Sequence, residues 1–365
     1  MKTINLFSSY ALILFAGLSL SLNSCKKKDP PPPVVYAPDD VYIAGAYTEA
    51  GIAYPAYWKN GEKVELIGLS DLKEAGYIEA ITVNGPDVYA VGQLYANAGQ
   101  IILWKNGKII KVTLDGEKFA QAKGISVSGT GDVYIVGSQK GANYFVPTYW
   151  KISGSDPVKS KPLTTESAEH VYGRGIAILN SNIYITGGTA SFKIMLWKDD
   201  GTMVTTSELN NDNSLTGYSS GYGIAVSNDN IYIGGVENNT VKYWRNNKND
   251  HVDLGVMSKT RTDLGCIALD ASNNVYMAGY DFSGPSKKAI YWKQGSAPVT
   301  LTTPATTTDE YASAIAVARN NVYVTGFFNA TPTTSRSILW MNGKKVPGFE
   351  GSKDIYATAL FVVKK

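Results

Sequence analysis

The sequence is poor in the residues that carry most enzyme and metal chemistry. Its 365 residues include 2 His and 2 Cys, whereas acid-base catalysis most often uses His and metal sites need clusters of His, Cys or carboxylates. Only 18% of the residues are charged, against about 25% in typical globular chains. The net charge of +3 is too balanced for a protein that neutralises phosphates. The composition predicts no metal, no cofactor and no nucleic-acid partner.

Residues that form strands and turns are abundant instead. The chain has 36 Gly, 24 Tyr and 7 Trp. Aromatic residues are enriched in β-strands and glycine in tight turns. We therefore expect an all-β protein.

The N-terminal residues predict export and membrane attachment. Lys2 precedes an apolar stretch whose strongest part, Ala11 to Leu22, is shorter than the roughly 20 residues that cross a bilayer. This pattern favours a signal peptide over residues 1–24 rather than a membrane-spanning anchor. Cys25, directly after Ser24, predicts a lipidated first residue of the mature chain, and residues 25–38, with Pro30 to Pro33, predict a semi-rigid spacer. Cys266 then stands alone in an apolar run, which favours a buried thiol over a nucleophile.

A repeat of about 47 residues organises the rest of the chain. The spacings between successive tryptophans are 46 to 48 residues, and every tryptophan belongs to this register: Trp58, Trp104, Trp150, Trp197, Trp244, Trp292 and Trp340. Several are followed by Asn-Gly, which is the strongest short signal for a β-hairpin. Upstream of each tryptophan lies a segment such as Asp87-Val88-Tyr89 that ends in Gly92, and most of these segments follow a small-residue strand such as Ala80 to Val83.

Four short strands per repeat predict one blade of a β-propeller, and seven repeats predict a seven-bladed β-propeller over residues 39–365. The first repeat has no convincing inner strand, while Tyr356 to Val363 matches the start of the preceding repeat. We expect this C-terminal strand to complete the N-terminal blade and close the ring. The alternative is that Val34 to Tyr36 forms that strand, although the proline run before it makes the segment a poorer candidate.

With units like Val88 to Gly92 followed by Leu103-Trp104-Lys105-Asn106-Gly107, residues 36–365 resemble repeat propellers of uncharacterised lipoproteins from Bacteroidetes-type bacteria. The resemblance implies an outer-membrane lipoprotein on the periplasmic or cell-surface side. It implies no activity. The Lys triplet after Cys25 differs from the acidic export tags of surface lipoproteins in such bacteria, which favours the periplasmic side.

The candidate site is one end of the propeller, where the residues just before each inner strand should surround the central channel. Unlike the strand positions, this ring does not repeat: Glu79, Lys123, Arg174, Tyr222, Gly265, Ser313 and Thr358. Four tyrosines lie one step further out: Tyr77, Tyr172, Tyr311 and Tyr356. Basic groups and phenols together suit a carboxylate-bearing glycan or a peptide end. The alternative is that these side chains only solvate the channel opening.

The remaining candidates for chemistry are weaker. His170 precedes an inner strand, where a solvated loop residue is the simpler interpretation, and His251 belongs to an expected outer strand. Asn210 to Asn213 and Asn228 to Asn230 have oxygen ligands without the full spacing of a calcium loop, so turns are expected there.

Three functions remain open. The first is a monomeric, non-enzymatic module, anchored in the membrane through Cys25, that binds a glycan, a peptide or an envelope protein. The second is a polysaccharide lyase or hydrolase, with Glu79, Lys123, Arg174 and Tyr222 as the acid-base and charge-stabilising set. The third is a structural subunit without a small ligand.

Overall fold

A computed structural model describes residues 39–68, 73–95, 99–112, 119–164, 168–210, 219–256, 267–282, 284–304, 309–331, 334–347, 349 and 355–365. The chain divides into the units Met1–Pro33 and Val34–Lys365, and every described residue belongs to the second. The predicted signal peptide, Cys25, the spacer and Cys266 lie outside the described residues. Across the described ranges, no helix combines the length and the apolar character that crossing a membrane requires.

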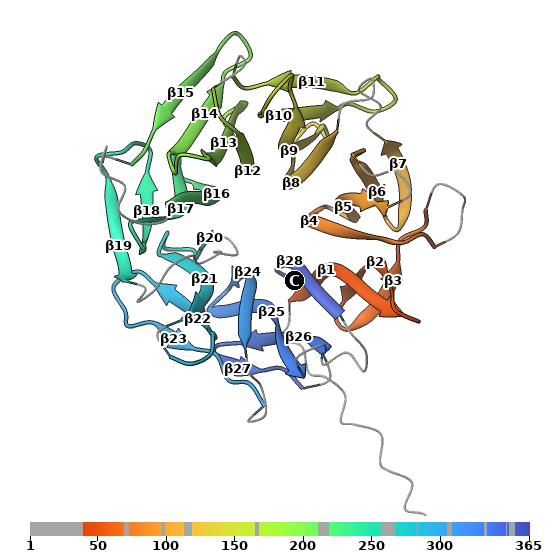
Figure 1. Cartoon of the computed structure of the whole chain (residues 1–365), viewed down its shortest axis with the longest axis vertical. Helices are drawn as coiled ribbons and strands as arrows, with labels where there is room; N and C mark the ends of the chain where they lie inside the picture. Colours follow the sequence, from red (N-terminus) through yellow and green to blue (C-terminus); the bar gives the residue numbers. More distant parts are fainter. Residues whose placement is uncertain are drawn as a thin grey trace, which may run out of the picture. The chain divides into compact units, whose positions relative to one another are not determined.

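Seven four-stranded antiparallel sheets form a seven-bladed β-propeller, as predicted (Figure 1). Blade 1 contains β28 (Ile355–Val363), β1 (Asp40–Glu49), β2 (Ile52–Lys59) and β3 (Glu62–Glu65). Blade 2 contains β4 (Gly76–Asn84), β5 (Asp87–Leu94), β6 (Ile102–Lys105) and β7 (Lys108–Val112). Blade 3 contains β8 (Ala120–Val127), β9 (Val133–Lys140), β10 (Phe145–Ile152) and β11 (Lys159–Pro162). Blade 4 contains β12 (Val171–Leu179), β13 (Asn182–Thr189), β14 (Ile194–Asp199) and β15 (Val204–Glu208).

The other three blades follow the same order from the inner to the outer strand. Blade 5 contains β16 (Ser220–Ser227), β17 (Asn230–Glu237), β18 (Thr240–Arg245) and β19 (His251–Val256). Blade 6 contains β20 (Ile267–Leu269), β21 (Val275–Asp281), β22 (Lys288–Lys293) and β23 (Val299–Thr300). Blade 7 contains β24 (Glu310–Ala318), β25 (Asn321–Thr331), β26 (Thr334–Met341) and β27 (Lys344–Lys345).

The C-terminal strand closes the ring. β28 pairs antiparallel with β1 and brings Val363 opposite Asp40 and Tyr356 opposite Ala46. It therefore occupies the inner position of blade 1, next to the first strand of the described chain (Figure 1). The alternative closure by Val34 to Tyr36 is wrong, because β28 already fills that position. Closure in this way gives blade 1 the same four strands as the other blades and joins the two ends of the described chain in one sheet.

The hydrophobic core is divided into seven clusters, each lying in the seam between two neighbouring blades. All seven tryptophans are buried in these seams. Trp104 Nε1 donates a hydrogen bond of 2.9 Å to the Ile67 carbonyl of the preceding blade, and Trp340 Nε1 donates one of 2.6 Å to Thr302. The tryptophans therefore recur every 46 to 48 residues because each seam between blades contains one of them.

The Asn-Gly turns lie at one end of the blades, which we name the turn end. Asn60 and Asn106 have φ values of 51° and 50° and are followed by glycines with φ above 80°, as expected for turns that join twisted strands. The Asn106 side chain accepts a hydrogen bond of 2.8 Å from Val88 N and donates one of 2.8 Å to Asp87. Asn60 makes the same pair of bonds to Val41 and Asp40. At this end, the turn between the third and fourth strands of a blade is thus hydrogen-bonded to the start of the second strand, and this contact repeats from blade to blade.

Candidate functional site

A cavity of about 390 Å³ lies on the propeller axis and is lined by residues of all seven inner strands. Figure 1 shows these strands, β4, β8, β12, β16, β20, β24 and β28, around the centre. The walls of the cavity are small and branched aliphatic side chains, such as Ala80 and Ile81. The predicted ring residues surround its opening at the end opposite the Asn-Gly turns. We name this opening the mouth.

The structure places the predicted ring inside the inner strands and not before them. Six of the seven residues lie at an irregularity of strand pairing, where two residues oppose one partner: Glu79, Lys123, Arg174, Tyr222, Ser313 and Thr358. Gly265 lies outside the described residues. A β-bulge of this kind breaks the alternation of side chains and re-aims the extra residue. The bulge explains how six strands that pack alike can each present a different side chain to the mouth.

The glycine of the Tyr-Gly strand is required by the bulge. A Cβ atom on Gly92 would overlap the Tyr77 carbonyl oxygen, and one on Gly137 would overlap that of Gln121. In each case that carbonyl belongs to the residue two positions before the bulged one. The same collision occurs in other blades, where the following pairs meet: Gly45 with Tyr356, Gly187 with Tyr172 and Gly326 with Tyr311. The repeated glycine thus makes room for the backbone of the site.

The bulged residues of blades 2 to 5 form two contacts across the seams. Lys123 Nζ lies 2.5 Å from Glu79 Oε1, with the two side chains 39% and 20% exposed. The Arg174 guanidinium carbon lies 5.0 Å from the centre of the buried Tyr222 ring, in cation-π geometry. Arg174 Nε is buried and has no hydrogen-bond partner in the described part of the protein. Two cations and one carboxylate thus face the mouth side by side.

Thr358 has a structural role in addition to its place in the ring. Its hydroxyl lies 2.7 Å from the Ile78 carbonyl and 3.2 Å from the Ala44 carbonyl, so it connects blade 1 to blade 2. Ser313 lines the cavity without such a contact in the described residues. The mouth is therefore more strongly charged on the side of blades 2 to 4.

The four predicted outer tyrosines fall into separate groups. The Tyr77 hydroxyl donates to Gln93, whose amide donates to the Ala120 carbonyl at 2.8 Å. Burial and the nearby Glu79 carboxylate raise the pKa of Tyr77. The Tyr172 ring stacks on His170 with centroids 6.0 Å apart. These contacts tie both phenols to the scaffold.

Tyr311 and Tyr356 share a neighbour that the sequence pattern did not indicate. Phe327 stacks on Tyr311 at 4.6 Å and meets the edge of Tyr356 at 5.9 Å. Lys287 Nζ lies 2.9 Å from the Tyr311 hydroxyl and 4.6 Å from the centre of that ring. Burial alone would lower the pKa of Lys287, but the hydrogen bond to Tyr311 and the nearby phenols raise it. Tyr356 is 42% exposed and is the most accessible aromatic ring of this group.

The two histidines differ in surroundings. His170 Nδ1 accepts a hydrogen bond of 3.1 Å from Phe145 N, and its ring packs against Tyr144 and Tyr172. His170 lies in the loop before β12, as expected, but it is half-buried and packs against its neighbours. His251 is exposed at the start of β19. Neither histidine lines the cavity of the mouth.

The two segments rich in oxygen ligands form a turn and backbone contacts where they are described. Asn228 and Asp229 have φ values of 47° and 63° and form the predicted turn between β16 and β17. Asn210 binds the backbone of Ile194 and Phe192, and residues 211–213 lie outside the described ranges. Within the described ranges, no three or more His, Cys, Asp and Glu side chains lie close enough together to hold a metal ion.

No family model and no curated protein matches the chain. Solved structures show similarity in fold. A streptogramin B lyase superposes with a TM-score of 0.50 and 12% identity, covering 85% of this chain and 96% of that one. A virginiamycin B lyase from Staphylococcus aureus gives 0.46 and 17%, with coverages of 72% and 83%. A structure of a nidogen/laminin complex gives 0.43 and 14%, with coverages of 76% and 98%. At 12% identity, the similarity to the streptogramin B lyase concerns the fold alone and does not assign a function.

Proposed function

We propose that this propeller is a non-enzymatic recognition module that binds its ligand at the mouth. The observation that carries the proposal is the bulge ring: six strands with similar packing each present a different side chain to one opening. A scaffold that repeats in its core and varies at one rim is the usual arrangement of a binding surface.

The charges at the mouth favour an anionic group in the ligand. Arg174 is held against Tyr222, which fixes the orientation of its guanidinium group. Lys123 is matched by Glu79, so Arg174 supplies the positive charge that has no carboxylate beside it in the described residues. A guanidinium group binds carboxylates through two parallel hydrogen bonds. We infer a carboxylate-bearing glycan or a peptide end as the ligand, with Tyr356 as an exposed ring for stacking.

The proposal includes the cellular setting inferred from the N-terminal sequence. Lipidated Cys25 attaches the chain to the outer membrane of a Bacteroidetes-type bacterium, and the spacer of residues 25–38 separates a monomeric propeller from the bilayer. Envelope glycans, peptides and proteins are then the ligands within reach. In membrane fractionation, Cys25→Ala should move the protein to the soluble fraction. Retention of the variant in the membrane would contradict the anchor.

A polysaccharide-active enzyme is the alternative use of the same opening. It requires Glu79 as the proton donor or acceptor, and Glu79 is the one carboxylate among the described ring residues. Its ion pair with Lys123 gives this carboxylate a local partner and supports the binding role. Turnover of an envelope polysaccharide that disappears in Glu79→Gln would favour the enzyme.

A binding screen with two matched variants tests the recognition role. The full chain is titrated with acidic glycans and peptides from the envelope, alone and as the Lys123→Ala/Arg174→Ala double variant. The control is Lys151→Ala, which removes a lysine of blade 3 that pairs with Asp132 at the turn end. We expect at least one ligand to bind, a loss of tenfold or more in the double variant, and no change in the control. Absence of any ligand, or equal affinities in all three proteins, would overturn the proposal.

A further inference from the structure

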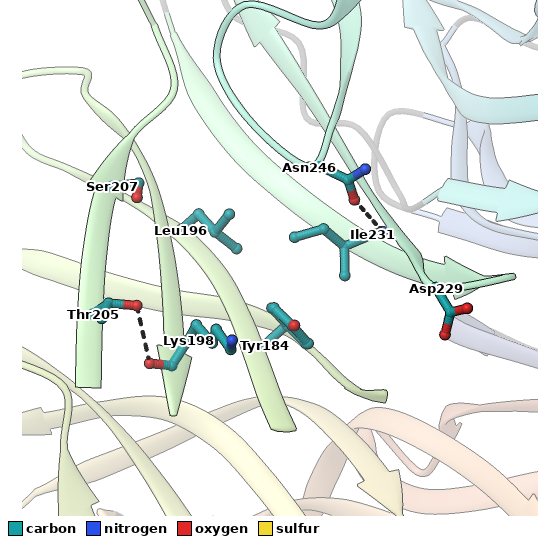
Figure 2. Close-up of a pocket in the computed structure, with 8 residues that line it drawn as sticks. All are labelled: Tyr184, Leu196, Lys198, Thr205, Ser207, Asp229, Ile231 and Asn246. Carbon is teal, nitrogen blue, oxygen red and sulfur yellow. Dashed lines mark hydrogen bonds between the residues drawn. The ribbon is translucent and has the colours of Figure 1, made fainter. Parts of the chain in front are cut away.

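A second hollow, of about 250 Å³, lies far from the mouth, in the seam between blades 4 and 5. Figure 2 shows Leu196, Lys198 and Ser207 of blade 4 on one side and Asp229 and Ile231 of blade 5 on the other. Asp229 belongs to the turn before β17 and Lys198 lies near the end of β14. The hollow is therefore at the turn end, where the other contacts of the blades repeat.

The hollow lies where blades 1, 5 and 6 place two larger side chains. The residue before each tryptophan lies opposite a residue of the outer strand. That cross-strand pair is Tyr57 and Val64 in blade 1, Tyr243 and Val252 in blade 5, and Tyr291 and Val299 in blade 6. In blade 4 the pair is Leu196 and Ser207. Blade 2 also has a leucine at this place, Leu103, but it lies opposite the longer Lys111. In blade 4 both side chains are small, and they leave the volume that the ring and the valine occupy in blades 1, 5 and 6.

Blade 4 also leaves a lysine without its usual carboxylate. The lysine after the tryptophan forms an ion pair in three other blades, Lys59 with Asp40, Lys105 with Asp87 and Lys151 with Asp132. In blade 4 the corresponding position is Asn182, and Lys198 makes no ion pair within the described residues. Its Nζ lies 6.0 Å from the centre of the Tyr184 ring. A positive charge thus borders the hollow beside an aromatic ring.

The opposite wall supplies hydrogen-bonding groups and an apolar floor. Asp229 accepts a hydrogen bond of 2.7 Å from Asn180 through Oδ1, and its second oxygen remains able to accept another. Asn246 holds the start of β17 by accepting from Ile231 N at 2.9 Å (Figure 2). Leu196 and Ile231 provide apolar surface between these groups and the Ser207 hydroxyl. The hollow thus offers a cation, a carboxylate, a hydroxyl and an apolar floor. This combination is complementary to a small ring that carries several hydroxyl groups.

We propose that this hollow binds a single pyranose unit that carries a carboxylate. Lys198 binds the carboxylate, Asp229 and Ser207 bind hydroxyls, and Leu196 and Ile231 contact the C–H face of the ring. The volume is below the roughly 300–1,000 Å³ of pockets that enclose drug-sized ligands, so it suits one unit and not a longer chain. The site is independent of the mouth and gives the propeller a second point of attachment to an acidic polysaccharide.

Glucuronate and glucose are the probes. In NMR titrations of the full chain, glucuronate should bind with a Kd on the order of 1 mM, as expected for so small a ligand, and glucose at least tenfold more weakly. The Lys123→Ala/Arg174→Ala variant should bind glucuronate equally well at this site, which separates the hollow from the mouth.

Two variants and one matched control locate the binding. Leu196→Tyr/Ser207→Val introduces the pair found in blades 1, 5 and 6. Added to the Lys123→Ala/Arg174→Ala variant, whose mouth cannot bind a carboxylate, it should abolish glucuronate binding without lowering the melting temperature. Lys198→Met should reduce glucuronate binding to the level of glucose. The control is Lys293→Met, since Lys293 also follows a tryptophan and lies over a tyrosine, Tyr276, but in a seam filled by Tyr291 and Val299. It should leave binding unchanged.

The proposal fails if glucuronate does not bind saturably to the Lys123→Ala/Arg174→Ala variant, if glucose binds to it equally well, or if glucuronate binding survives when Leu196→Tyr/Ser207→Val is added to that variant and the protein remains folded. A melting temperature lowered by Leu196→Tyr/Ser207→Val would show that the hollow is not an unfilled seam and would likewise overturn the account.

Discussion

The turn end and the mouth end of the blades differ in how their side chains are used. At the turn end, Asn60 and Asn106 make the same two hydrogen bonds in their blades. At the mouth end, the equivalent bulged positions hold Glu79, Lys123 and Arg174, which make different contacts. Repetition therefore marks the groups that hold the strands of each blade together, and variation marks the groups to which we assign ligand recognition.

The largest loss of stability is expected at Gly137, the glycine that makes room for the bulge of blade 3. Gly137→Val would place a Cβ onto the Gln121 carbonyl oxygen, and backbone cannot move aside as a side chain can. We expect a loss of about 3 kcal/mol or more in the free energy of unfolding, measured by denaturant titration. Gly129→Ala is the control, because a Cβ there meets nothing within 4 Å. Equal stability of both variants would show that the glycine is not required by the bulge.

A buried carboxylate in the seam of blades 3 and 4 should give the next largest effect. Asp199 is 1% exposed and binds Tyr149 at 2.7 Å and Lys161 at 2.5 Å. Burial alone would raise the pKa of Asp199, but hydrogen bonds from Lys161, Tyr149 and the Gly201 amide lower it below its usual range. We expect Asp199→Asn to lower the free energy of unfolding by about 2 kcal/mol at pH 7.

The lowered pKa of Asp199 also fixes the sign of a pH dependence. The stabilisation is fully present above the unfolded-state pKa of about 4 and is lost as the pH falls through the lower folded-state pKa. The stability difference between wild type and Asp199→Asn should therefore shrink below about pH 4. Melting curves between pH 2.5 and pH 7 measure it. A difference that grows on acidification would contradict the assignment.

A single turn-end amide should give a smaller loss. Asn106→Gly keeps the positive φ available but removes the bonds to Val88 and Asp87. We expect about 1 kcal/mol of destabilisation by denaturant titration. The control is Asn143→Gly. Asn143 is exposed in the mouth-end hairpin of blade 3 and makes no side-chain hydrogen bond in the described residues, so this change should alter the free energy of unfolding by less than about 0.5 kcal/mol. A larger effect at Asn143 would reverse the comparison of the two ends.

The repeat and its closure could be predicted from the sequence, because their chemistry is local. Tryptophan spacing marks the seams, Asn-Gly marks turns, and the likeness of Tyr356 to Tyr311 and their neighbours marked the closing strand. A buried leucine directly after the outer strand, as at Leu66 and Leu301, recurs in the same way and is a further local mark of the repeat.

The position of the ring within the strands could not be predicted, because a bulge interrupts the alternation on which strand assignment depends. Charged residues such as Lys123 looked like loop residues, although strand pairing continues to Ala120. The signal was nevertheless present in the glycine of the neighbouring strand, since Gly137 is needed only where the bulged backbone approaches. The seam hollow was also hidden, because it depends on the sizes of Leu196 and Ser207, which lie on different strands.

The most direct test of the division between the ends compares stability and binding in the same variants. Lys123→Ala/Arg174→Ala should lose less than about 1 kcal/mol of stability, because its partly exposed ion pair and cation-π contact contribute little, while binding of the acidic envelope ligand falls tenfold or more. Asn106→Gly should lose stability and keep full binding. If the mouth variant binds normally, or if the turn-end variant loses binding while folded, recognition does not reside in the bulge ring.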